Sequence, residues 1–191
     1  MSDSLAPTGR PQLRVAVLMR REAVQGPMAR WQPWRWVLAE VVPQEPGFGT
    51  QPRCLRTDAH EALWLYPDWC VQLYTDDAEG YWLNATSPTP AFFVMWRMSE
   101  PDDGTAPMAV PQEVSLSYHD AGRWLDAQET VETSPAPPDV VAWVSAFAEQ
   151  HFVPEPKRRQ RPQSFQGLTD RFGQPARIST EGKRKTGGGP P

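Results

Sequence analysis

The sequence predicts an α+β domain: an antiparallel β meander that forms a sandwich or partial barrel, followed by a short helix and a longer C-terminal amphipathic helix. Three observations lead to this fold class. Short alternating apolar runs fill the chain up to about residue 116, helical spacing appears only after them, and 22 Pro and 13 Gly supply frequent turns. The 191 residues fit one domain over 12–154, with disordered segments expected at 1–11 and 155–191.

The first strands are predicted by alternation of apolar and other residues. Leu13–Met19 has an apolar residue at every second position, which indicates one buried face, and Trp34–Leu38 repeats the pattern. We expect these two strands to pair. Further short strands are predicted at Cys54–Arg56 and Leu63–Tyr66, the second ended by Pro67.

The middle of the chain predicts a hairpin and two longer strands. Val71–Tyr74 and Tyr81–Ala85 flank a polar turn, which is typical of a hairpin. Ala91–Met98 is a nearly continuous apolar run, and Val110–Leu116 follows it after a loop. Successive short strands of this kind predict an antiparallel meander.

Two helices are predicted at the end of the domain. Ser117, followed three residues later by Asp120, resembles a capping box and starts a short helix. Pro137–Pro138 suits the first turn of a longer helix, and apolar residues within Val140–His151 lie along one face of it. We expect this helix to cover one face or an open edge of the sheet.

Charge divides the chain into regions of opposite sign. Residues 1–154 contain 10 Lys+Arg and 20 Asp+Glu, whereas residues 155–191 contain 9 and 3. Residues 57–154 hold only Arg97 and Arg123 against 16 acids. The surface of this central segment should therefore repel free nucleic acid.

The chain is expected to be cytoplasmic. No run approaches the roughly 20 apolar residues that a membrane helix needs. The apolar residues 15–19 precede Arg20 and Arg21, which reverses the order found in a signal peptide. Cys54 and Cys70 are therefore expected to stay reduced.

The sequence predicts no metal and no cofactor. Cys54, Asp58, His60, Asp68 and Cys70 fall within 17 residues and are of zinc-binding type, but no Cys-x-x-Cys motif accompanies them. We interpret the cysteines as small buried residues and His60 as a loop residue.

Catalytic chemistry is not predicted either. A nucleophilic site needs Ser or Cys to converge with His and a carboxylate. We interpret His151 as a cation at a helix C-terminus and His119 as an exposed residue in the first turn of the short helix. Asp76, Asp77 and Glu79 are interpreted as solvated acids of a hairpin turn, so we expect the protein not to be an enzyme.

The best candidate binding surface in the domain interleaves arginines with tryptophans between residues 20 and 36. Its candidate partner-binding residues are Arg30, Trp31 and Arg35. Such a mixture binds nucleic acid by stacking or a protein by anchor residues. The residues alone favour a structural alternative, in which the tryptophans close the barrel and the arginines stack on their faces.

The C-terminal tail offers two further candidates. Its basic residues form either a nonspecific polycation or a solubilising spacer, and its apolar residues are spaced i, i+3, i+7, as on one face of a helix formed on docking. The basic set is Lys157, Arg158, Arg159 and Arg161, and the apolar set is Phe165, Leu168 and Phe172.

Several aromatic and basic segments together resemble a known bacterial family. These segments are Val15–Arg21, Arg30–Trp31, Trp34–Trp36, Gly80–Asn84, Phe93–Arg97 and Pro154–Arg159. Over roughly residues 12–166 the chain is similar to the family called domain of unknown function 3305. The resemblance implies no catalytic residues. It implies a genomic context, because genes of this family tend to lie near those of molybdenum-dependent formate dehydrogenase.

The leading hypothesis is a non-catalytic accessory protein that helps to mature, assemble or regulate a formate dehydrogenase by binding a subunit or a maturation factor. The first alternative is an RNA- or ribosome-associated protein that uses the basic tail and the Arg/Trp segment. The second is an enzyme of unrecognised type.

Overall fold

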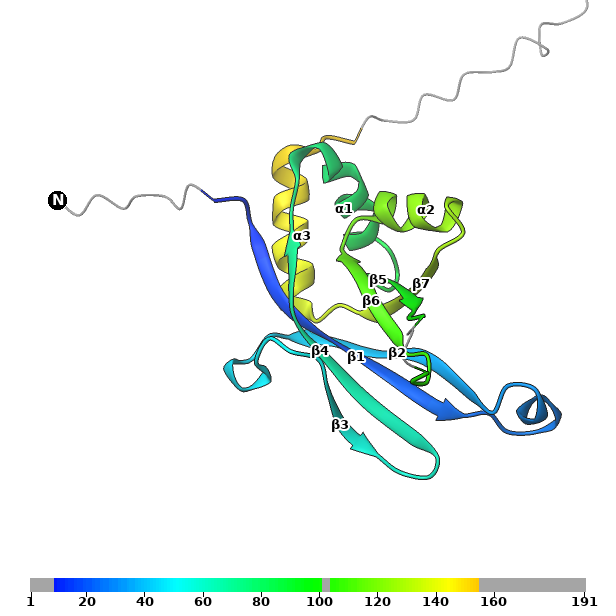
Figure 1. The fold of residues 1–191 in the computed structure, drawn as a ribbon. Coiled ribbons are helices and arrows are strands. Elements are labelled where there is room, and N and C mark those ends of the chain that lie inside the picture. Colours follow the sequence, from blue (N-terminus) through cyan, green and yellow to red (C-terminus); the bar gives the residue numbers. More distant parts are fainter. Residues whose placement is uncertain (1–8, 101–103, 155–191) are drawn as a thin grey trace, which may run out of the picture. The chain divides into compact units, whose positions relative to one another are not determined.

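The computed structural model describes residues 9–100 and 104–154, and these form an α+β unit with two antiparallel sheets (Figure 1). A four-stranded sheet has the order β2-β1-β4-β3, and a three-stranded sheet has the order β6-β5-β7. The predicted fold class is confirmed. Within the described residues both sheets are open, so the strands do not close into a barrel.

The four-stranded sheet is built around β1 (Gln12–Ala23), which pairs with β2 (Trp34–Pro43) as predicted. Its other neighbour is β4 (Glu61–Gln72), and β3 (Arg53–Thr57) forms the edge beyond β4. Short 3-10 turns interrupt the connections, η1 (Pro27–Arg30) after β1 and η2 (Pro46–Phe48) after β2.

Pro67 does not end its strand, contrary to prediction. β4 continues through it to Gln72, and the pairing with β1 shifts register between Val15 and Val17. Asp68 at this irregularity has a positive φ of 68°. A bulge accommodates a proline because the residue there needs no place in the regular hydrogen-bond ladder.

The three-stranded sheet has β5 (Ala91–Met98) at its centre, within the bounds that the apolar run predicts. β6 (Ala109–Ser115) pairs with it on one side, close to the predicted range. β7 (Thr130–Pro135) pairs on the other side and has no counterpart among the predicted strands.

The predicted hairpin at 71–85 is wrong in its second half. After a 3-10 turn, η3 (Thr75–Asp77), the chain enters helix α1 (Ala78–Ala85) instead of a return strand. Ala78 and Tyr81, three residues apart, are both buried on the inner face of this helix. Burial of that helical face outweighs the strand preference of a Tyr-Trp pair.

Two further helices follow as predicted. In α2 (Tyr118–Asp126) the Ser117 hydroxyl accepts the backbone N–H groups of His119 and Asp120 at 3.2 and 3.4 Å. α3 (Pro138–His151) begins with Pro in its first turn and buries Val140 and the rest of one face. It packs on α1, beside the strands of the larger sheet (Figure 1).

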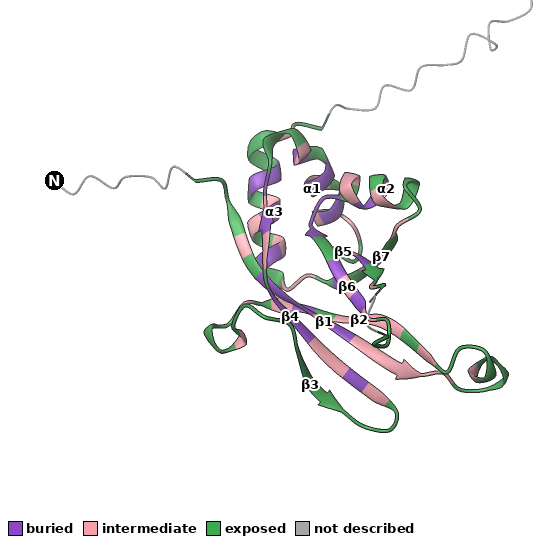
Figure 2. Cartoon of the chain, in the orientation of Figure 1, coloured by how far each residue is buried: buried purple, intermediate pink, exposed green. Residues whose placement is uncertain are grey.

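The core lies where the two sheets and α3 meet (Figure 2). Val17 of β1, Phe92 of β5 and Val144 of α3 are each at most 1% exposed within this cluster. Polar bonds also join the sheets: the Tyr66 hydroxyl donates to the carbonyl of Ala109 at 2.9 Å. Burial raises the pKa of Tyr66 to about 12.

β7 joins the two sheets at the edge strand β2. The Val41 N–H donates to Ser134 Oγ at 3.0 Å, and the Leu38 N–H donates to the Glu132 carboxylate. These bonds satisfy backbone donors of β2 that its partner β1 leaves unpaired. Among the described residues, no helix has the length and apolar character required to cross a membrane.

Candidate functional site

One end of the four-stranded sheet projects past the three-stranded sheet (Figure 1). We call this end the arm and define it as residues 20–36 and 53–64. It consists of two hairpin ends, one from β1 and β2 and the other from β3 and β4. The Ala23 N–H donates to the His60 carbonyl at 2.8 Å, which joins the two hairpin ends.

The tip of the arm is the turn between β1 and β2. Gly26 has a φ of 85°, a left-handed conformation that favours glycine, and it leads into the 3-10 turn that starts at Pro27. The turn is closed by hydrogen bonds to the Met28 carbonyl from the N–H groups of Trp31 and Gln32, both at 3.0 Å.

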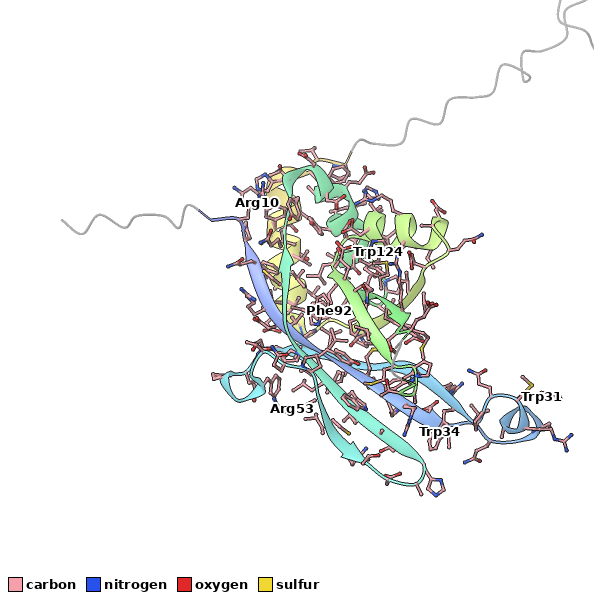
Figure 3. The ribbon with its side chains drawn as sticks, viewed as in Figure 1. Arg10, Trp31, Trp34, Arg53, Phe92 and Trp124 are labelled. Carbon is pink, nitrogen blue, oxygen red and sulfur yellow. The ribbon has the colours of Figure 1, made fainter. Side chains whose placement is uncertain are left out.

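Trp31 stands out from this tip into solvent (Figure 3). Its side chain is 80% exposed, Met28 is 61% exposed, and Arg30 is also exposed. The structural interpretation, in which the tryptophans close a barrel, is therefore wrong for Trp31. An exposed Trp beside an exposed Arg has the composition of a binding hot spot.

For Trp34, the stacking part of the structural interpretation is correct, although the described strands form open sheets and no barrel. The Arg21 guanidinium lies 4.6 Å from the centre of the Trp34 ring, and the indole is partly buried. This stacking is confirmed as a cation–π contact within the sheet.

Arg35 differs from Arg30 because its guanidinium is held in an ion pair. Its Nε donates to Glu22 at 2.6 Å, and Arg20 Nε lies 3.2 Å from the other oxygen of that carboxylate. The hydrogen bond from Arg35 is the main reason why the pKa of Glu22 lies below its ordinary value. Of the three predicted residues in the arm, Arg30 and Trp31 are exposed, whereas Arg35 is held in an ion pair with Glu22.

A cavity of about 590 Å³ lies between the two hairpin ends of the arm. Glu22, Asp58 and Glu61 contribute its carboxylates. Asp58 accepts the N–H groups of His60 and Glu61 at 2.7 and 2.9 Å, and these bonds lower its pKa. Glu61 pairs with Arg56. Because Glu22 and Asp58 have lowered pKa values, they stay ionised at neutral pH and are poor proton donors.

The zinc-type residues do not converge. Cys54 is exposed on β3 and pairs in register with Trp64, whereas Cys70 lies six positions further along β4. At about 3.3 Å per residue the two thiols are roughly 20 Å apart along the sheet. Within residues 9–100 and 104–154, no group of three or more His, Cys, Asp or Glu side chains is arranged to hold a metal ion.

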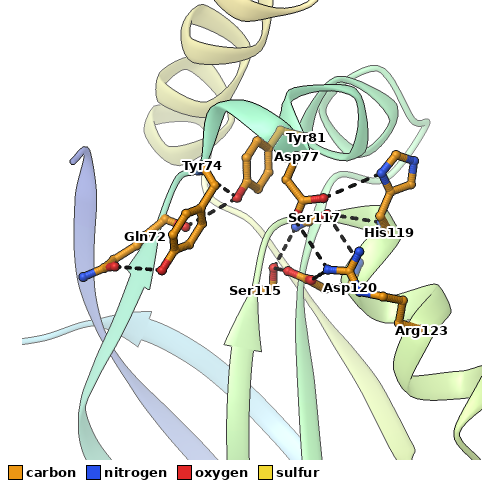
Figure 4. Close-up of polar contacts among 9 residues, drawn as sticks. All are labelled: Gln72, Tyr74, Asp77, Tyr81, Ser115, Ser117, His119, Asp120 and Arg123. Atoms are coloured by element: carbon orange, nitrogen blue, oxygen red, sulfur yellow. Dashed lines mark hydrogen bonds and ion pairs between the residues drawn. The ribbon is translucent and has the colours of Figure 1, made fainter.

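Ser, His and Asp side chains do meet where α1 and α2 pack together (Figure 4). His119 Nδ1 lies 3.7 Å from Asp77 Oδ1, and Ser117 is close by. However, Ser117 is 0% exposed and its oxygen caps α2. A nucleophile must be accessible to its substrate, so this serine has a structural role.

Gly80 explains how closely the two helices approach. A Cβ at this position would lie 2.4 Å from Ser117 Oγ and 3.2 Å from the His119 ring. His119 is consequently half-buried, whereas the sequence predicted an exposed residue. Arg123 completes the cluster by pairing with Asp120 and lying 3.7 Å from Asp77.

The remaining candidates in the domain, one histidine and two acids, are exposed at the ends of helices. His151 is the last residue of α3, exposed, with its ring 4.5 Å from that of Phe147. Asp76 and Glu79 are exposed near the start of α1, where a helix favours negative charge. The candidates of the tail all lie outside the described residues: Lys157, Arg158, Arg159, Arg161, Phe165, Leu168 and Phe172.

Sequence reasoning missed the role of Asn84. It is 2% exposed and bonds three backbone groups, donating to the carbonyls of Ala91 and Leu116 and accepting the Ala91 N–H, at 2.8 to 3.0 Å. A polar residue inside the apolar segment at 81–85 was the available signal, because such a residue must find partners when buried.

Comparisons with curated proteins and with solved structures each found no match. The model of a family described as "Protein of unknown function (DUF3305)" matches residues 14–161, which is most of the chain. This match covers the arm and both sheets. The chain therefore belongs to the DUF3305 family.

Proposed function

We propose that this protein is a non-catalytic accessory factor that binds a protein partner through the tip of its arm. The observation that carries the proposal is the exposure of Trp31, 80%, at the end of a projecting hairpin. Large aromatic side chains contribute more binding free energy than other residues when a partner buries them, and arginine is the usual companion.

The tip is also held in shape before binding. Hydrogen bonds to the Met28 carbonyl hold the turn, and Gly26 supplies the backbone conformation that starts it. A side chain on a preorganised turn loses less conformational entropy on association than one on a flexible segment. Trp31 is therefore suited to be an anchor residue.

The proposed partner is a cytoplasmic subunit of a molybdenum-dependent formate dehydrogenase or one of its maturation factors. Support comes from the genomic context that the family resemblance implies, in which genes of this family tend to lie near those of this enzyme. Such proximity is an associational argument. Binding during maturation, assembly or regulation fits a protein that exposes an anchor residue at the end of a projecting hairpin.

RNA binding is the second candidate, and the composition of the arm favours it. Exposed tryptophan stacks on unpaired bases, and arginine contacts phosphate. Against it, Arg35 and Arg56 are already paired with Glu22 and Glu61, which reduces the positive charge that the arm offers.

Affinity purification from the native host tests the proposal. Tagged wild-type protein, Trp31→Ala and the control Leu125→Ala are compared, because Leu125 on α2 is also exposed, at 58%. We expect dehydrogenase subunits with the wild type and the control, and about tenfold less recovery with Trp31→Ala. Recovery that disappears after ribonuclease treatment would favour the RNA-binding alternative.

The tail provides a second comparison in the same experiment. One variant replaces its three apolar residues by Ala, and the other neutralises its basic cluster; the residues are Phe165, Leu168 and Phe172, and Lys157, Arg158, Arg159 and Arg161. We expect the apolar change to weaken recovery more at physiological salt, because apolar anchors supply most of the affinity. A loss caused by the charge change alone would indicate an electrostatic mode of binding.

A further inference from the structure

A second hollow of about 410 Å³ opens on the arm, on the face of the sheet that continues the core. Arg21, Trp36 and Ala62 lie side by side in the strand register, and Trp64 pairs with Cys54 one step further along. Residues 105–108, between β5 and β6, line its other side. We call this hollow the groove.

The shape of the groove follows from its residue types. Trp36 and Trp64 are partly buried and supply broad apolar walls. Ala62 lies between Arg21 and Thr57 in the register, and its small side chain leaves space between the larger ones. Polar atoms form only a small part of the lining, and among the described lining residues Arg21 alone is charged.

Arg21 is unlike the other arginines of the sheet. Arg14, Arg20, Arg35 and Arg56 all pair with carboxylates, and Arg53 donates to the backbone carbonyls of Gly47 and Phe48. Within the described residues Arg21 has no ion pair, and its Nε is buried without a hydrogen-bond partner. Instead, its guanidinium stacks on the Trp34 ring.

A buried guanidinium N–H without an acceptor is unfavourable, and a carboxylate is its best partner because the two groups have matching planar geometry. Apolar walls strengthen such a pair by excluding water. Trp36, Trp64 and Met108 at the same time offer apolar contact area. The groove is therefore complementary to an anionic side chain that has an apolar neighbour.

We propose that the groove binds a short segment of a protein partner in which a Glu or Asp lies beside an apolar residue. The carboxylate accepts from Arg21, and the apolar side chain packs on Trp36 and Trp64. This inference rests on the proposed function, since it specifies the chemistry of the partner that the arm would recognise.

A nucleic acid is a poorer fit to the groove than a peptide. Phosphates along a strand require several cations in a row. Arg21 is the one cation among the described residues of the groove. Arg14, Arg20 and Arg35 lie at alternate register positions, on the other face of the sheet. One carboxylate in an apolar setting matches one arginine.

The test uses two capped peptides, Ac-Ala-Leu-Glu-Leu-Ala-NH2 and its Gln counterpart, titrated into the full chain with ¹⁵N-labelled tryptophan. We expect the Glu peptide to shift the indole signals of Trp36 and Trp64 in a saturable way. We expect the Gln peptide to bind about tenfold more weakly, because it lacks the charge that Arg21 recognises.

Three variants assign the effect to the groove. Arg21→Gln should bind both peptides equally weakly. The matched control Arg14→Gln, on the other face of the same strand and in a surface ion pair with Asp68, should behave as wild type. Cys54→Trp fills the groove from an exposed position on β3 and should weaken both peptides without altering Arg21. Dispersed indole signals in each variant show that it is folded.

Several results would overturn the inference. These are the absence of any saturable shift in the wild type, equal binding of the two peptides, or a preference for Glu that persists in Arg21→Gln. The peptides involve no dehydrogenase and no contact with Trp31. A failure here would therefore leave the capture experiment with Trp31→Ala unaffected, and the converse also holds.

Discussion

The four-stranded sheet and the rest of the domain differ in both charge and exposure. Residues 9–72 contain eight arginines and six acids, whereas residues 73–154 contain only Arg97 and Arg123 against 13 acids. The basic region projects an exposed tryptophan, whereas the buried polar side chains of the described residues, Asn84, Ser115, Ser117 and Ser134, all lie in the acidic region (Figure 2). The proposed binding residues and the buried polar residues therefore lie in different parts of the described chain.

The polar contacts of the two regions differ in the same way. Ion pairs in the arm, such as Arg56 with Glu61, lie at the surface, where such pairs contribute little to stability. In the acidic region Asn84, Ser117 and Ser134 are at most 2% exposed and each bonds backbone groups. Buried bonds of this kind are costly to break.

The largest expected effect is that of Asn84→Ala. Two carbonyls and one N–H would lose their partner inside the core, so the free energy of unfolding should fall by about 3 kcal/mol. Urea denaturation followed by circular dichroism measures it. A loss below about 1 kcal/mol would show that water or a shifted backbone satisfies these groups.

Trp31→Ala gives the contrasting result in the arm. Its side chain is exposed, so we expect the free energy of unfolding to change by no more than about 0.5 kcal/mol. A loss comparable to that of Asn84→Ala would mean that Trp31 stabilises the fold, and the division between the two regions would fail.

The next effect concerns the connection between the sheets. Ser134→Ala would leave the Val41 N–H without its acceptor, at an expected cost of about 1 to 2 kcal/mol. Thr133→Ala is the matched control, because Thr133 is next to Ser134 in the strand and its side chain is exposed. Equal denaturation midpoints for the two variants would contradict a role for this bond in joining the sheets.

The smallest effects are those of pH on the free energy of unfolding. Ionisation of a carboxylate should stabilise the fold in the basic region and destabilise it in the acidic region. Arg35 and Arg20 lower the pKa of Glu22 from 4.5, so its stabilising contribution is complete above that pH and is lost as the pH falls through the lower folded value. Glu22→Gln should therefore be less stable than wild type at pH 7 and equal to it in acid. Denaturation midpoints across pH 3 to 7 measure the difference.

Glu113 in the acidic region should behave in the opposite way. Although the residue is exposed overall, desolvation of its carboxyl and the nearby Asp120 raise its pKa above 4.5, and Arg123 only partly opposes them. Ionisation in the folded state is then unfavourable as the pH rises past 4.5. Glu113→Gln should be slightly more stable than wild type at pH 7, and a loss of stability there would contradict the sign.

Elements with strong local signals were predictable from the sequence. Ala91–Met98 forms β5 because a continuous apolar run suits a central strand, and Ser117 caps α2 because its hydroxyl reaches two free N–H groups. The segment Tyr81–Ala85 was not predictable in the same way, since its aromatic residues prefer strands and only packing against α3 makes it helical.

The candidate site was predictable in composition but not in geometry. Trp31 and Trp34 are three residues apart among similar neighbours, yet one is exposed and the other lies beneath Arg21. The groove brings Arg21 next to Ala62, which is distant in sequence, so strand register had to be known. No local pattern contains that information.

One measurement tests the division of roles most directly. A photo-reactive phenylalanine analogue is placed at Trp31 in one strain of the native host and at Leu125 in another, since both side chains are exposed, at 80% and 58%. Illumination of living cells followed by mass spectrometry identifies the covalent adducts. The account predicts a formate dehydrogenase subunit or maturation factor joined at position 31 and none at position 125. Adducts at 125 with none at 31 would contradict it and assign binding to the acidic region.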